Sequence, residues 1–565
     1  MSQAEAHPPT AHLVQEPPLH IAGILACLGP GLIIAGSIVG SGELIATTIT
    51  GAEAGFWLLW LIVIGCVIKV FVQVELGRDA VSTGKTTMDA LSEVPGPAIR
   101  GRGNWLLWYW FLMFTASMAQ LGGIVGGVGQ AMAISVPLTQ EGRDFNRYVT
   151  AKTELDVVKA ESRLASEGVK TAAPADKPAQ AERAARLEAE VLAKASRLAE
   201  LGERPTPSRD DQLWAILIAI ITSALLIVGR YRLIEIVTTT MVAAFTLVTV
   251  VNVLALQSTE SWAITWTDIV NGFSFRLPPA SQDGGGTALA TALKTFGIIG
   301  VGASELVAYP YWCQEKGYAR FTGPREAGGG WAERARGWMT VMRWDAWCSM
   351  IVYTTATLAF YLLGAAILGR TGLIPKGNEL VRTLAVMYEP VFGAWAQLLF
   401  LVGAFAVLYS TYFVASAGNA RVFSDALRVM GLAAHSPEAS RRRVRALSGF
   451  LPLLCLAIYL TTENLPERYK VGPEQLVLLS GMMQALMLPM LAAAALYFRY
   501  FKCDPRIAPG KVWDFFLWLS SLAMLFTAGI LLKGEIDKAL NKPAATQPAA
   551  VQPATPAKLL PPVEP

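Results

Sequence analysis

Apolar segments of about twenty residues, the length of helix that crosses a bilayer, recur along most of the chain. Each such segment predicts one membrane-spanning helix. We expect about eleven spans, of which the first and sixth are interrupted: 22–52, 55–75, 105–136, 213–229, 234–256, 289–312, 345–368, 393–417, 447–462, 474–498 and 513–532. The pattern predicts an all-α polytopic membrane protein, with helices 1–3 within 21–138 and helices 4–11 within 212–535.

Three stretches do not fit a membrane helix. Residues 139–211 are charged, and their leucines and valines recur at helical spacing on both sides of a turn near Pro174. We expect this insert to be a helical hairpin outside the cytoplasm, with either a solvated surface or a surface that docks a partner. Residues 1–20 and the Pro- and Ala-rich residues 543–565 are expected to be disordered tails, and the first of them lacks the basic region of a signal peptide.

Composition supports the membrane assignment and narrows the function. Charged residues are 16% of the chain and hydrophobic residues 53%, whereas soluble proteins carry about 25% charged residues. The net charge of +4 comes without a basic patch, so nucleic acid is not an expected partner. The six cysteines lack metal-ligand spacing, and the sequence has no phosphate-binding loop, hydrolase triad or zinc motif. We therefore expect no cofactor and no enzymatic activity.

Positive charge is concentrated in alternate loops. If the N-terminus is cytoplasmic, the loops on that side carry most of the loop arginines and lysines, including Arg441, Arg442 and Arg443, while the short outer loops carry few, such as Arg276. Cytoplasmic loops of membrane proteins are enriched in Lys and Arg. We therefore expect a multi-pass protein of a bacterial inner (plasma) membrane with its N-terminus in the cytoplasm.

Two of the expected spans share a short motif. Residues 39–46 read Val-Gly-Ser-Gly-Glu-Leu-Ile-Ala, and residues 301–308 read Val-Gly-Ala-Ser-Glu-Leu-Val-Ala. The copies are five spans apart, so they have opposite orientations in the membrane and predict an inverted 5+5 repeat. Transporters with such repeats bind substrate near the midplane, where two interrupted helices meet. The motif therefore predicts a substrate site between broken helices 1 and 6.

Glu43 and Glu305 occupy the same position in the two copies of this motif. An ionisable side chain at mid-membrane costs about 2.5–3.5 kcal/mol even on lenient insertion scales, so both carboxylates need a reason to be there. One interpretation is a cation or proton site in which Glu43 and Glu305 are metal ligands. The other is that each carboxylate caps a half-helix N-terminus. The predicted ion-binding residues are Gly40, Ser41, Glu43, Gly302, Ser304, Glu305 and Gln484.

The second span also contains polar residues. Gln73 follows Lys69 by four residues, which places both side chains on one face of a helix. The interpretation we favour is a structural contact between these two side chains rather than a transport pathway.

Three segments near the start of the chain match a known pattern: Gly29-Pro30-Gly31 through Glu43, Gly55-Phe56-Trp57-Leu58-Leu59-Trp60, and Gly77-Arg78-x-Ala80-x-x-Thr83-Gly84. In these segments the chain resembles the opening of Nramp-type (natural resistance-associated macrophage protein-like) divalent metal transporters. The likeness is densest in residues 29–92 and covers most of the chain as topology. It implies eleven or twelve spanning helices around a leucine-transporter-like core, and transport of a divalent metal.

The chain departs from this family's metal motifs. Gly40-Ser41-Gly42-Glu43 stands where the family carries Asp-Pro-Gly-Asn, and Gly302-Ala303-Ser304 stands where it carries Met-Pro-His. Gly481 replaces a ligating glutamine, with Gln484 one turn away. Without a thioether ligand, the oxygen-bearing residues favour a hard divalent cation of the Mg²⁺ or Mn²⁺ type, with or without proton coupling. The alternatives are a transporter of an organic cation and a sensor or scaffold that no longer transports.

Overall fold

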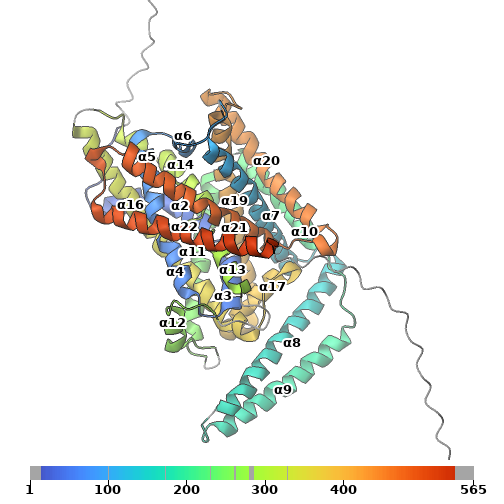
Figure 1. Cartoon of the computed structure of the whole chain (residues 1–565). Helices are drawn as coiled ribbons and strands as arrows, with labels where there is room; N and C mark the ends of the chain where they lie inside the picture. Colours follow the sequence, from blue (N-terminus) through green and yellow to red (C-terminus); the bar gives the residue numbers. More distant parts are fainter. Residues whose placement is uncertain are drawn as a thin grey trace, which may run out of the picture.

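The fold is described from a computed structural model of the chain. The structure describes residues 14–540 except 100, 172, 229–230, 260–261, 279–285 and 327–328. Within these ranges the regular elements are helical, and the longest helices form one bundle from which a helical hairpin projects (Figure 1). The all-α membrane fold predicted from the apolar pattern is confirmed.

The long helices coincide with the predicted spans. In chain order they are α2 (Pro30–Ile38) with α3 (Thr48–Ala54), α4 (Leu59–Val67) with α5 (Lys69–Thr83), α7 (Trp105–Ser135), α10 (Asp210–Val228), α11 (Tyr231–Leu256), α13 (Gly286–Phe296) with α14 (Ala303–Lys316), α16 (Gly329–Leu363), α19 (Ala396–Val429), α20 (Pro437–Glu463), α21 (Pro473–Tyr497) and α22 (Lys511–Leu540). Eight helical stretches of the described chain are by themselves long and apolar enough to cross a membrane. The total of eleven crossings stays a prediction.

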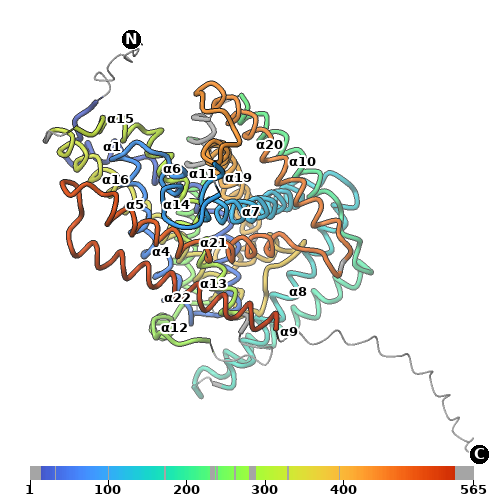
Figure 2. Tube along the Cα trace, turned by 45° about the horizontal axis from the view of Figure 1, so that its top comes forward, coloured from blue at the N-terminus to red at the C-terminus, as the bar shows by residue number. Residues whose placement is uncertain are grey.

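Shorter elements connect these helices. They are α1 (Ile21–Cys27), η2 (Gly42–Thr47), α6 (Thr87–Ser92), α12 (Trp266–Gly272), α15 (Tyr318–Thr322), η3 (Gly364–Gly369), η4 (Gly377–Glu379), α17 (Leu380–Ala385), η5 (Val386–Tyr388), α18 (Glu389–Phe392), η6 (Gly393–Trp395), η7 (Glu467–Tyr469), η8 (Phe498–Lys502) and η9 (Pro505–Ile507). Helix α7 passes through the middle of the bundle (Figure 2) and packs against α10, α19, α20 and α21.

Two helices are broken where the repeated motif occurs. The first break spans residues 39–41, between α2 and the π-helical turn η2 that leads into α3. The second spans residues 297–302, between α13 and α14, and Gly300 within it has a φ of 56°. Only glycine adopts this left-handed region without strain. The pair of interrupted helices predicted for the leucine-transporter-like inverted repeat is therefore present.

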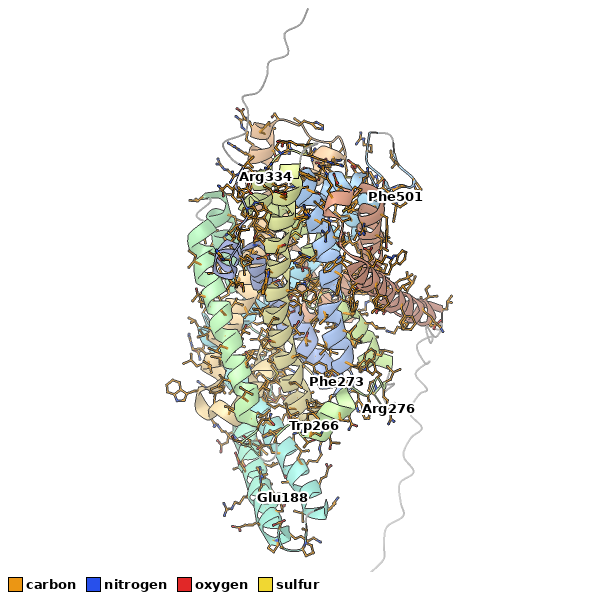
Figure 3. The ribbon with its side chains drawn as sticks, turned by 90° about the vertical axis from the view of Figure 1, so that its left-hand side faces the viewer. Glu188, Trp266, Phe273, Arg276, Arg334 and Phe501 are labelled. Atoms are coloured by element: carbon orange, nitrogen blue, oxygen red, sulfur yellow. The ribbon has the colours of Figure 1, made fainter. Side chains whose placement is uncertain are left out.

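The two ends of the bundle carry different loops. Arg334 and Phe501 lie at one end, while Glu188, Trp266 and Arg276 lie at the other (Figure 3). We call these the Arg334 end and the hairpin end. The loops expected on the two sides of the membrane are thus separated, and which end faces the cytoplasm stays a prediction. Helices α8 (Gln140–Thr171) and α9 (Lys177–Glu200) pair along their length and project from the hairpin end (Figure 1).

The N-terminal segment is more ordered than predicted. The indole of Trp338 donates a hydrogen bond of 2.9 Å to the carbonyl of Gln15, whose N–H donates to the carbonyl of Phe321. The predicted disordered tail 1–20 therefore extends too far at its C-terminal end, because Gln15 is held by hydrogen bonds to α15 and α16. The rest of this tail, and the whole of 543–565, fall outside the described residues.

Candidate ion-binding site

A polar cluster in the centre of the bundle joins the two breaks. Its hub is Gln120 on α7. The Gln120 amide nitrogen donates to the Ser41 hydroxyl at 3.1 Å, and its amide oxygen accepts hydrogen bonds from Ser480 at 3.0 Å and from Gln484 at 2.9 Å. Helix α7 thereby connects the first break to α21.

The cluster continues from Gln484 to the second break. The amide oxygen of Gln484 accepts hydrogen bonds from the Ser304 hydroxyl at 2.7 Å and from the Ser304 N–H at 3.1 Å. The same hydroxyl lies 3.2 Å from a carboxylate oxygen of Glu305. Ser304 and Glu305 are in the first turn of α14, where freed backbone N–H groups favour negative charge. The N-terminus of this half-helix therefore presents a carboxylate and several neutral oxygens.

Gly302 permits this arrangement by having no side chain. A Cβ atom at Gly302 would lie 2.5 Å from a Glu305 carboxylate oxygen and 2.8 Å from the Gln484 amide oxygen. These distances are shorter than any real Cβ contact. A side chain at position 302 would require the ends of the Glu305 and Gln484 side chains to move.

A small cavity opens onto this cluster. Its volume is about 30 Å³, which is room for about two water molecules. It lies between α2, α7, α14 and α19, and its polar lining residues are Ser37, Ser117, Gln120, Ser304, Glu305, Thr411 and Asn419. Glu305 is partly exposed and contributes a carboxylate to the lining. The cavity therefore offers an ion one negative charge and a set of neutral oxygens.

Glu43 is placed differently from Glu305. It is fully buried, and its carboxylate accepts the N–H of Gly40 at 3.4 Å and that of Gly300 at 3.3 Å. The hydroxyl of Thr357 on α16 donates to it at 3.3 Å. Glu43 does not line the cavity, and it connects the two breaks to each other through their free backbone N–H groups.

Gly40 also belongs to the first break rather than to the cavity. A Cβ atom at Gly40 would lie 2.0 Å from the Thr411 hydroxyl oxygen, and that hydroxyl donates to the Ser37 carbonyl at 3.0 Å. The absence of a side chain thus lets the first break approach α19 closely. Of the predicted residues, the structure brings together Ser41, Gly302, Ser304, Glu305 and Gln484, and sets Glu43 and Gly40 beside them.

Several residues of this centre were missed from sequence. Gln120, Ser480, Thr411 and Asn419 belong to no recognisable sequence motif. The one available signal was that the glycine-rich apolar span of α7 contains glutamine, at Gln120 and Gln130. The predicted contact between Lys69 and Gln73 is wrong. The Lys69 ammonium instead donates to the carbonyls of Phe296 and Ile299, and the Gln73 amide has no hydrogen-bond partner within the described ranges.

The donor set suits some ions better than others. Across the described residues, no three His, Cys, Asp or Glu side chains come together as a metal-binding group. The cavity offers carboxylate, amide and hydroxyl oxygens, which are the ligands that hard cations such as Mg²⁺, Ca²⁺ and Mn²⁺ prefer. An ion held there would keep part of its water shell.

Two broken helices that meet at a small polar cavity inside an all-α bundle define a polytopic membrane transporter of the inverted-repeat class. Residues 192–533 match the family described as natural resistance-associated macrophage protein-like (Nramp), and the chain belongs to this family. The matched range excludes residues 29–92, where the sequence motifs resemble the family most.

Solved structures extend the comparison over nearly the whole chain. Two variants of the manganese transporter of Eremococcus coleocola are similar to it at 13% and 14% identity, with TM-scores of 0.56 and 0.55. Each alignment covers 94% of this chain and 92% of the other. At this identity the likeness shows a shared fold. No curated protein matches the sequence.

Proposed function

We propose that the chain is a secondary transporter of a hard divalent cation, of the Mg²⁺ or Mn²⁺ type, that binds in the central cavity with part of its hydration shell. The observation that carries this proposal is the partly exposed Glu305 carboxylate, which lines a small polar cavity beside Ser304 and Gln484. Membership of the Nramp family and the shared fold with a manganese transporter support a metal as the cargo.

The ligand chemistry supports a hard ion. Glu305 provides the negative charge, and the oxygens of Ser41, Gln120, Ser304 and Gln484 are within one hydrogen-bonded cluster around it. Mg²⁺ retains several waters and binds protein through one or two carboxylates, which fits a site with a single lining carboxylate.

Glu305 also suits a proton-linked exchange in this proposal. A carboxylate at the end of a half-helix can hold a proton when the cation is absent, and the incoming cation then displaces that proton. Glu43 has a positioning role, since its carboxylate binds the backbone of both breaks and is shielded from the cavity.

A route between the cavity and the Arg334 end would run between α14 and α19. Ala308 and Trp312 extend its lining along α14, and Gly418 and Asn419 extend it along α19. Beyond them Arg421 of α19 forms an ion pair of 2.5 Å with Glu315 of α14, and its guanidinium lies 5.1 Å from the Trp312 ring. Separation of α14 from α19 at this ion pair would widen the route between the cavity and the Arg334 end.

Thermal unfolding of the purified protein with a panel of divalent chlorides tests the proposal. A ligand that binds only the folded state raises stability with its concentration, so Mg²⁺ or Mn²⁺ should raise the unfolding temperature of the parent. Glu305→Gln should abolish this rise, while Glu188→Gln in the middle of α9 should retain it. A parent that responds to no divalent ion would contradict the proposal.

A further inference from the structure

Lys69 is a fully buried cation that lies outside the cavity lining. It is the first residue of α5, within the second span, and its side chain is 0% exposed. Its ammonium donates to the carbonyl of Phe296 and, at 2.7 Å, to that of Ile299, and it lies 4.7 Å from the centre of the Phe296 ring. Because a charge inside a membrane protein is costly, these contacts need to stabilise it.

The carbonyls that Lys69 binds belong to the second break. Helix α13 ends at Phe296, and the last carbonyls of a helix have no partner within it and carry partial negative charge. Lys69 reaches these carbonyls from a different helix. At the same break the Glu43 carboxylate accepts the N–H of Gly300. A cationic and an anionic side chain thus hold the carbonyls and the N–H of one unwound segment.

Such a set of oxygens is also a site for a dissolved cation. Unwound carbonyls and the C-terminal ends of half-helices coordinate coupling cations in transporters with broken helices. The Glu43 carboxylate, which accepts the N–H of Gly300, adds a negative charge to this break. The surroundings of the ammonium therefore have the composition of a monovalent-cation site.

We infer that Lys69 is a tethered cation that permanently fills a monovalent-cation site formed by the carbonyls of Phe296 and Ile299 at the end of α13. The site is separate from the cavity proposed for the transported ion. Because its cation is covalently attached, the folded protein requires no dissolved sodium or potassium. Removal of the ammonium leaves the carbonyls and nearby carboxylates uncompensated, so an alkali cation can then bind.

Thermal unfolding in NaCl, KCl, LiCl and choline chloride at equal ionic strength tests this inference. The parent should unfold at the same temperature in all four salts. Lys69→Met should unfold earlier in choline chloride and recover several degrees in at least one alkali chloride. Lys69→Gln, a milder change that retains an N–H donor on a shorter side chain, should show the same selective gain.

Two controls separate this effect from general salt stabilisation. Lys69→Arg keeps the charge and should behave as the parent. Lys294→Met removes a lysine from the same half-helix whose ammonium pairs with Glu535 at 3.2 Å, and it should gain nothing from alkali cations. The inference is overturned if neither Lys69→Met nor Lys69→Gln gains stability from an alkali cation. If Lys69→Met cannot be recovered folded in any salt, a Lys69→Gln variant that does not respond overturns it in the same way. It is also overturned if the parent itself requires sodium or potassium. Divalent binding plays no part in this readout, so the result is independent of the proposed function.

Discussion

Replacing Gln120 with leucine removes the side chain through which α7 joins the first break to α21. The Gln120 amide makes three hydrogen bonds, with Ser41, Ser480 and Gln484. Hydrogen bonds between membrane helices contribute about 0.6 kcal/mol each, so the three together contribute about 2 kcal/mol. If this free energy supports the ion-bound arrangement, cation affinity should fall about 20–30-fold, because 1.4 kcal/mol is a factor of ten.

Calorimetric titration of the purified variant with Mg²⁺ and Mn²⁺ measures this change directly. Gln397→Leu, near the start of α19 and outside the cavity, is the matched control and should bind as the parent does. If Gln120→Leu lowers the unfolding temperature but binds the cations with parental affinity, the cluster is structural, and the reasoning that connects it to the ion is refuted.

Three further changes test other parts of the structure. Gly302→Ala places a methyl group 2.5 Å from a Glu305 oxygen, so it should weaken divalent-cation binding at least tenfold in the same titration. Binding with parental affinity would contradict this prediction. Glu315→Gln removes the ion pair with Arg421. Because exposed pairs contribute less than about 1 kcal/mol, stopped-flow measurements should show ion exchange that is faster by about fivefold at most. Slower exchange would argue that this ion pair is not a gate. Outside the spans, burial and the nearby carboxylates of the hairpin raise the pKa of Glu389 to about 7. Between about pH 4.5 and pH 7, Glu389 therefore keeps its proton in the folded state but loses it in the unfolded state, whose pKa is the ordinary value of 4.5. The contribution of Glu389 to the free energy of unfolding falls as pH rises through this range. Glu389→Gln should raise the unfolding temperature at pH 8 but not below pH 4.5, and equal effects at both would contradict the assignment.

The positions of the broken helices could be predicted from sequence, because the repeated motif marks both breaks and a glycine occurs in each. The orientation of the two glutamate side chains could not be predicted from sequence. Glu43 lies in a π-helical turn after a break of three residues, whereas Glu305 lies in the first turn of an α-helix after a break of six. Side-chain direction depends on this local backbone, so equal places in the motif lead to a buried contact in one copy and a cavity lining in the other.

The rest of the site depends on contacts between helices far apart in the chain. Gln120 meets Gln484 across 364 positions, and no local pattern signals that pairing. Lys69 was assigned to Gln73 because the two share a helix face. Its ammonium instead binds freed carbonyls at the end of α13, where the helix C-terminus carries partial negative charge. Such carbonyls become available only when the sixth span unwinds.

Cation uptake into proteoliposomes tests the central claim most directly. The parent, reconstituted with a divalent-sensitive dye inside the vesicles, should take up Mg²⁺ or Mn²⁺ at a rate that saturates with concentration. Glu305→Gln, which keeps the shape of the side chain and removes its charge, should reduce this uptake to the level of empty vesicles, while Glu188→Gln should transport as the parent does. Uptake by Glu305→Gln at the parental rate would contradict the assignment of the central cavity as the transport site.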